Sequence, residues 1–116
     1  MADKVTHFEV HGSDGKRLQA SYAALFAWKV DANNPMHYGL VGAEPGGIGG
    51  GITQSPMAPR VTFYVEVADL FASLAKAESL GGKTLMEPDP VPGGPRIAMF
   101  ADPDGNAIGL IQAGSR

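Results

Sequence analysis

The order of the predicted elements occurs twice along the chain, and it constrains the fold more than any other feature. Each half begins with a strand of alternating character and continues through a capping aspartate, Asp14 or Asp69, into an amphipathic helix and three further strands. The two aspartates lie 55 positions apart (69 − 14). The predicted strands cover residues 4–11, 27–30, 37–42 and 48–52 in the first half and 61–67, 83–86, 96–100 and 107–111 in the second, with helices over 15–26 and from 69 to about 80.

This repeat predicts an α+β fold of two βαβββ modules in a cupped, eight-stranded mixed sheet. We expect one domain over residues 1–116, with a first module at 3–52, a linker at 53–60 and a second module at 61–112. The linker is predicted from its composition, TQSPMAP over residues 53–59. The sequence does not say whether the modules pair within one chain or are swapped between two.

Composition excludes several classes of protein. A net charge of −3 argues against nucleic-acid binding, which needs a basic face. The absence of cysteine excludes disulfides and is compatible with a reducing cytoplasm, where we expect the protein. No apolar run is long enough to span a bilayer, and the first residues lack a signal peptide, so we expect no membrane partner.

Two predicted strands carry most of the candidate acid, base and ligand-binding side chains. In the first, Phe8 and Val10 point toward the helix while His7, Glu9 and His11 share the other face. His7 and His11 lie about 13 Å apart on a strand, too far for one metal ion, whereas His7 and Glu9 can meet in one site. That pair is also the only predicted acid and base. A polar face turned to water is the alternative for this strand.

The equivalent strand of the second half has the same two-faced character. It places Phe63, Val65 and Val67 toward its helix and Thr62, Tyr64 and Glu66 on the other face. If the two halves form one curved sheet, the two polar faces line a cup.

At this level the sequence resembles the vicinal oxygen chelate superfamily, which groups glyoxalases, bleomycin-resistance proteins and extradiol dioxygenases. It is closest to the single-domain bacterial members called glyoxalase-like, and the resemblance implies paired βαβββ modules, often in a homodimer. The most specific match is the turn Asp102-Pro103-Asp104-Gly105-Asn106 followed by a final strand. The other matching segments are VTHFEV at 5–10, YAALFAW at 22–28, VEVADL at 65–70 and AESLGG at 77–82.

The resemblance also implies where metal ligands would lie. His7 matches the ligand on the first strand, but Thr62 stands where metal-binding members usually have His, and Gly109 where they have Glu. The fourth position falls in Gly49-Gly50-Gly51, which offers no side chain. Because a catalytic divalent ion needs about three protein ligands, we expect no metal cofactor. The alternative is a divalent ion held by His7 and Glu9.

We therefore expect a protein that binds a small organic molecule in the cup without a metal. Alternatives are a metal-dependent lyase, isomerase or dioxygenase with His7 as a ligand, and a non-catalytic structural or regulatory domain; whether a reaction is catalysed stays open. Trp28 is expected in the core and Tyr38 in the cup wall. The predicted ligand-binding residues are His7, Glu9, Thr62, Tyr64, Glu66, Arg96, Met99 and Gly109.

Overall fold

The computed structural model describes residues 2–115 and divides into two compact units. Residues 7–62 form what we call the N-terminal unit, and residues 63–115 together with 2–6 form the C-terminal unit. The two long strands β1 (Lys4–Gly12) and β5 (Arg60–Val67) each contribute residues to both units. Residues 55–59 lie between β4 and β5.

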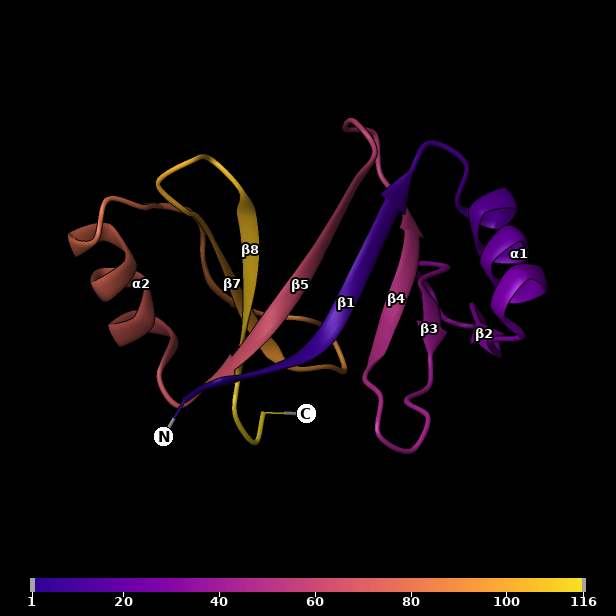
Figure 1. The fold of residues 1–116 in the computed structure, drawn as a ribbon, viewed down its shortest axis with the longest axis horizontal. Coiled ribbons are helices and arrows are strands. Elements are labelled where there is room, and N and C mark those ends of the chain that lie inside the picture. The colour runs from indigo at the N-terminus through magenta and orange to yellow at the C-terminus, as the bar shows by residue number, and fades with distance from the viewer. Residues whose placement is uncertain (1, 116) are drawn as a thin grey trace. The chain divides into compact units, whose positions relative to one another are not determined.

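In the N-terminal unit, β1 pairs in parallel with β4 (Gly49–Gln54), and β4 pairs antiparallel with β3 (Gly39–Val41). The two-residue strand β2 (Val30–Asp31) pairs with β3. Helix α1 (Gly15–Phe26) packs against β4 and covers only one face of these strands (Figure 1).

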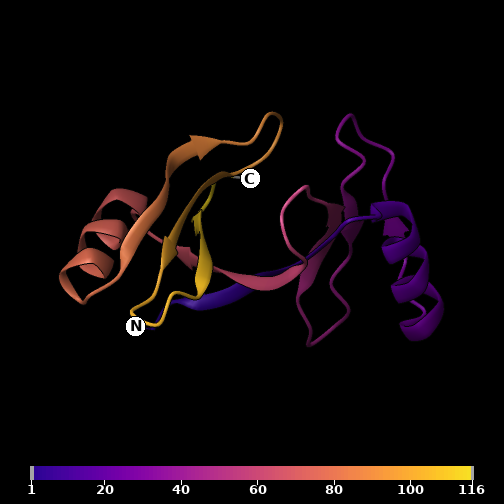
Figure 2. The ribbon, with the colours of Figure 1, turned by 90° about the horizontal axis from the view of Figure 1, so that it is seen from above.

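The C-terminal unit has the same arrangement. Strand β5 pairs in parallel with β8 (Ala107–Gln112), followed by antiparallel β7 (Arg96–Ala101) and β6 (Lys83–Pro90). Helix α2 (Leu70–Ser79) packs against β6, β7 and β8 (Figure 2). The predicted α+β class, with two βαβββ modules and eight strands of mixed direction, is confirmed.

Both helices begin at the predicted aspartates. The Asp14 carboxylate accepts a hydrogen bond from the Arg17 amide at 3.1 Å, and Asp69 accepts one from the Ala72 amide at 3.0 Å. Each bond satisfies an amide that has no partner within the first turn of a helix. Between residues 2 and 115, neither helix is long and apolar enough to cross a membrane.

Each unit has its own apolar core beneath its helix. In the N-terminal unit Trp28 packs against the Phe8 ring at a centroid distance of 5.4 Å and stacks on Tyr22 at 5.8 Å, as expected for a core residue. The remaining members are Val10, Leu18, Val30, Val41 and Ile52 in this unit, and Val65, Val67, Leu70, Leu74, Ala98, Phe100 and Leu110 in the other.

Three local predictions are wrong: two concern the ends of the helices and one concerns a residue of β5. The apolar spacing of the two helices predicts that Leu25 and Leu80 face the cores, but they are 70% and 69% exposed, and each lies at the C-terminal end of its helix. Phe63 is 40% exposed, while Val65 and Val67 face α2 as predicted. The strand predicted at 27–30 is reduced to Val30–Asp31 because Ala27 ends α1 in the left-handed conformation (φ 58°) and turns the chain.

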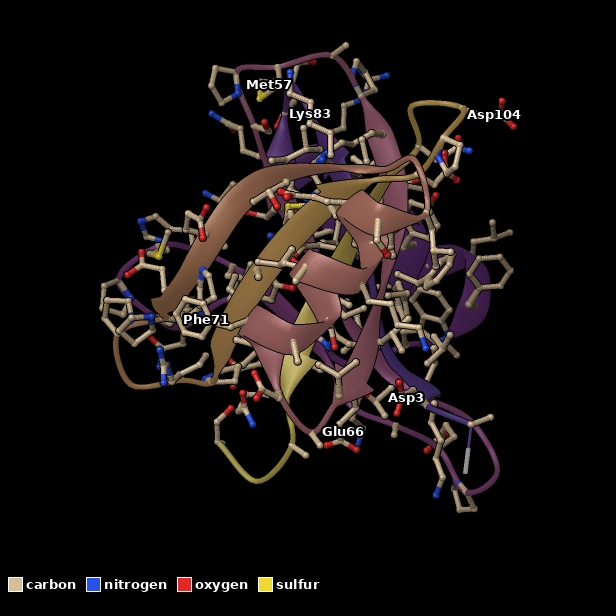
Figure 3. The ribbon with its side chains drawn as sticks, turned by 90° about the vertical axis from the view of Figure 1, so that its left-hand side faces the viewer. Asp3, Met57, Glu66, Phe71, Lys83 and Asp104 are labelled. Atoms are coloured by element: carbon tan, nitrogen blue, oxygen red, sulfur yellow. The ribbon has the colours of Figure 1, made fainter. Side chains whose placement is uncertain are left out.

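The predicted turn between β7 and β8 is built around Asp102. Its carboxylate accepts bonds from the amides of Asp104 and Asn106 and from the Asn106 side chain, each at 2.9 Å. Gly105 supplies the required positive φ of 89°, and Asp104 lies at the tip of the loop (Figure 3). The Asn106 side-chain amide, followed by its backbone amide, lowers the pKa of the Asp102 carboxyl below its ordinary range.

A lowered pKa makes the contribution of this turn dependent on pH. The ionised Asp102 stabilises the folded chain above the unfolded-chain pKa of about 3.9, and this contribution is lost as the pH falls through the lower folded value. We expect Asp102→Asn to lower the urea midpoint at pH 7, with the difference from wild type shrinking below about pH 4.

Asp104→Asn is the matched control, because among residues 2–115 no bond accepted by the Asp104 carboxylate holds the turn. It should leave the urea midpoint nearly unchanged at both pH values. An Asp102→Asn effect of the same size at pH 7 and pH 3 would contradict the assignment.

Candidate functional site

Four side chains form a continuous chain of hydrogen bonds on the polar face of β1. His7 Nε2 lies 2.9 Å from the Tyr38 hydroxyl oxygen, and that hydroxyl donates to Glu9 Oε2 at 2.7 Å. The other carboxylate oxygen, Glu9 Oε1, lies 2.6 Å from His11 Nε2. Glu9 is only 8% exposed, so the bonds to its carboxylate are largely shielded from water.

The number of protons fixes the direction of these bonds. A tyrosine hydroxyl has one proton, and Tyr38 gives it to Glu9. His7 therefore donates its Nε2 proton to the Tyr38 oxygen, and His11 donates its Nε2 proton to Glu9. Each imidazole is held in one tautomer, which is the arrangement that acid and base side chains need.

The segment from Asn34 to Tyr38 is pinned so that the hydroxyl reaches this position. The Asn34 side chain accepts from the Tyr38 amide at 2.9 Å and donates to the Tyr38 carbonyl at 2.7 Å. The Gln19 amide on α1 donates to the His37 carbonyl at 3.1 Å and to the Ile52 carbonyl at 2.8 Å. His37 itself adopts a left-handed φ of 53°, an uncommon conformation that these bonds maintain.

The glycine run in β4 makes room for the aromatic side chains. Gly51 is the register partner of Glu9 on β1, and a Cβ atom there would overlap the Tyr38 hydroxyl and ring well inside the 3.0 Å that Cβ atoms keep. Gly50 faces the other side and is covered in the same way by the Phe8 ring. The run is therefore filled by protein atoms.

Gly109 has an equivalent environment in the C-terminal unit. It pairs with Tyr64 on β5 and with Met99 on β7, and a Cβ atom there would overlap the Tyr64 ring. Tyr64 and Met99 are 6% and 9% exposed. An aromatic ring over a strand glycine restores the packing that the missing side chain would have made.

The predicted site residues therefore fall into two local groups. His7 and Glu9 belong to the hydrogen-bonded chain of the N-terminal unit, and Tyr64, Met99 and Gly109 are neighbours in the C-terminal unit. Three others lie outside these groups: Thr62 is buried on β5, Glu66 is half-buried near the end of β5 (Figure 3), and Arg96 is exposed at the start of β7.

Sequence reasoning missed the central position of Tyr38 and the participation of His11. The sequence predicts Tyr38 only as part of the cup wall, and it pairs Glu9 with His7. The imidazole that Glu9 contacts at 2.6 Å is that of His11, while Tyr38 bridges Glu9 to His7. The sequence feature that could have revealed the position of Tyr38 is Gly51. Its importance is clear only once the β1–β4 register places it opposite Glu9.

Comparison with protein families supplies the identity of this fold. A family model described as Glyoxalase/Bleomycin resistance protein/Dioxygenase superfamily matches residues 4–110. The chain belongs to this superfamily. A search of curated protein sequences gave no match.

Several solved structures share the fold at low sequence identity. A hypothetical protein from Bacillus halodurans C-125 is 13% identical with a TM-score of 0.71, covering 100% of this chain and 98% of that one. Methylmalonyl-CoA epimerase from Mycobacterium tuberculosis is 16% identical with a TM-score of 0.69, covering 93% and 86%. The Mn(II)-bound glyoxalase from Novosphingobium aromaticivorans is 19% identical with a TM-score of 0.66, covering 96% and 40%.

The residues of this superfamily member do not fit a metal ion. Of the four positions implied by the resemblance, only His7 has a side chain of a usual metal-ligand type. A carboxylate at Gly51 needs the space of Tyr38, and one at Gly109 needs the space of Tyr64. Throughout residues 2–115, no three His, Cys, Asp or Glu side chains converge on one point.

The overlap at Gly51 generates a test by a double-mutant cycle. Gly51→Ala is expected to lower the free energy of unfolding by on the order of 3 kcal/mol, because the added methyl forces Tyr38 out of its position. In a Tyr38→Ala background the same substitution should have little further effect. Chemical denaturation of the four proteins measures the coupling.

Gly42→Ala is the control, because no atom lies within 4 Å of the position of its Cβ and its φ is not in the left-handed region. It should be neutral in both backgrounds. Equal destabilisation by Gly51→Ala with and without Tyr38 would show that the hydroxyl does not occupy this space.

Proposed function

We propose that this superfamily member binds a small organic molecule without a metal ion, using the His7–Tyr38–Glu9 cluster as its polar anchor. The observation that carries the proposal is the position of the Tyr38 hydroxyl over Gly51, between His7 and Glu9. The cluster brings together an imidazole, a hydroxyl and a carboxylate, which are polar groups of the kind that orient ligands in small-molecule sites.

Structural relatives support a small-molecule ligand. One is a methylmalonyl-CoA epimerase in complex with methylmalonyl-CoA and NH4+, 17% identical with a TM-score of 0.65, and another is a Streptomyces coelicolor epimerase in complex with 2-nitronate-propionyl-CoA. We propose that Thr62, Tyr64, Glu66, Arg96, Met99 and Gly109 contribute further contacts.

We also propose that the protein is a cytoplasmic homodimer. The apolar side chains of Leu25, Phe71 and Leu80 are 70%, 61% and 69% exposed, which favours burial in an assembly. The absence of cysteine from the sequence is compatible with a reducing compartment.

The proposal is tested by metal analysis and thermal unfolding of the purified protein. We expect no stoichiometric Ni, Zn, Mn or Fe, and no change in Tm with a chelator or added divalent metal. A panel of aromatic compounds, glycopeptides and acyl-CoA esters should include a compound that raises Tm by several degrees, since a ligand at 100 times its Kd stabilises by about 2.7 kcal/mol.

Glu9→Gln should reduce the ligand-induced rise, because it replaces one of the two oxygens that bind Tyr38 and His11. Glu44→Gln, at an exposed glutamate, is the matched control and should preserve the rise. Stoichiometric metal that is lost on His7→Ala would overturn the metal-free proposal. A panel in which no compound raises Tm would favour a structural or regulatory domain instead.

A further inference from the structure

The His7 and Tyr38 rings lie nearly in one plane. The angle between their planes is 12°, and their centroids are 6.4 Å apart. His7 Nε2 lies 2.9 Å from the Tyr38 hydroxyl oxygen. Because an imidazole N–H lies in the plane of its ring, a nearly linear bond keeps that oxygen close to the imidazole plane. The two rings therefore lie side by side and form one flat surface, which we call the ring platform.

One face of the platform lies against the backbone of β4. The Tyr38 ring covers Gly51, since a Cβ atom there would overlap the hydroxyl oxygen and two adjacent ring carbons. The next residue, Ile52, belongs to the core beneath α1, so Gly51 faces away from that helix. The other ring face therefore looks away from the sheet. His7 and Tyr38 are each half-buried, which leaves part of the platform accessible.

Leu40 adds an apolar side chain beside this surface. It is the register partner of Gly51 on β3. Its neighbour Val41 packs in the core beneath α1, so the Leu40 side chain points to the same side of the sheet as the platform. Leu40 is 51% exposed. A ligand that covers the Tyr38 ring is therefore bordered by an apolar group.

The Tyr38 ring is rich in electrons. The face of an aromatic ring carries a negative electrostatic potential because of its quadrupole. Tyr38 also donates its hydroxyl proton to the Glu9 carboxylate at 2.7 Å, and this bond polarises the phenol further. Such a ring stacks best on a planar ring from which electrons have been withdrawn.

From this geometry we propose that the ring platform selects a planar, electron-poor conjugated ring. The ring stacks on Tyr38 and His7, and a polar substituent on it forms hydrogen bonds with the same cluster. This inference rests on the proposed binding function of the His7–Tyr38–Glu9 cluster and names the chemical class of its ligand. A saturated ring with the same substituent binds more weakly, because a puckered ring does not lie flat on the platform.

Three amides with one common polar group are suitable probes: pentafluorobenzamide, benzamide and cyclohexanecarboxamide. Their affinities for the full chain are measured by NMR titration. We expect pentafluorobenzamide to bind most tightly, benzamide next, and cyclohexanecarboxamide about tenfold more weakly than pentafluorobenzamide. Benzamide should also shift the ring protons of His7 and Tyr38 upfield, because stacked rings lie in each other's ring current.

The contribution of the ring is measured by comparing Tyr38→Leu with Tyr38→Phe. Both variants lose the hydroxyl, but only Tyr38→Phe keeps an aromatic face. We expect benzamide to bind Tyr38→Leu about tenfold more weakly than Tyr38→Phe. Thermal unfolding of each variant verifies that it is folded, and if Tyr38→Leu does not fold, the comparison of the three amides on the unaltered chain decides.

Leu40→Ala should weaken benzamide binding a few-fold, because it removes the apolar border of the platform. Leu85→Ala is the matched control, since Leu85 is 50% exposed and lies in the C-terminal unit. It should leave the affinity unchanged.

Three results would overturn the inference: equal binding of benzamide and cyclohexanecarboxamide, equal binding of benzamide by the two Tyr38 variants, or no binding of any amide at tens of millimolar. The proposed function has a separate test. If the amides fail but another compound raises Tm and Glu9→Gln reduces that rise, the polar anchor stands and the stacking inference alone is wrong.

Discussion

The polar face of β1 depends on the absence of a side chain at Gly51. Because this position carries only hydrogen, the Tyr38 ring can lie against β4 and bring its hydroxyl between His7 and Glu9. The bonds from Asn34 and Gln19 keep the preceding segment in place. A local packing constraint therefore determines which ring nitrogen of His7 donates a proton to Tyr38.

The C-terminal unit also has a strand glycine covered by a tyrosine, at Gly109, but the tyrosine comes from a different place in the chain. Gly109 is covered by Tyr64, which comes from the adjacent strand itself, whereas Gly51 is covered by a tyrosine that precedes β3. At Gly109 the covering ring is buried beside Met99, and at Gly51 the hydroxyl of the covering tyrosine joins a chain of four polar groups. The two units therefore cover equivalent strand glycines with tyrosines that come from different parts of the chain.

Most of the fold could be predicted from the sequence because helix caps and tight turns depend on residues that are close together in the chain. Asp14 and Asp69 cap their helices through an amide three residues away, and Asp102 organises its turn within five residues. Ala27 escaped prediction because a left-handed alanine has no signal in composition. The role of Tyr38 could not be predicted either, because it depends on the register that places Glu9 opposite Gly51. The sequence of one strand does not determine its register with a strand that is distant in the chain.

The paired positions 38 and 51 also restrict the order in which this chain can change. A carboxylate introduced first at position 51 meets the Tyr38 ring, so the intermediate is overpacked. Replacement of Tyr38 by a small residue first leaves Glu9 and His7 without their bridge but opens the space. A stepwise change that places a metal-binding carboxylate on β4 is therefore less destabilising when Tyr38 is replaced first, and that order removes the bridge between His7 and Glu9 before any carboxylate is gained.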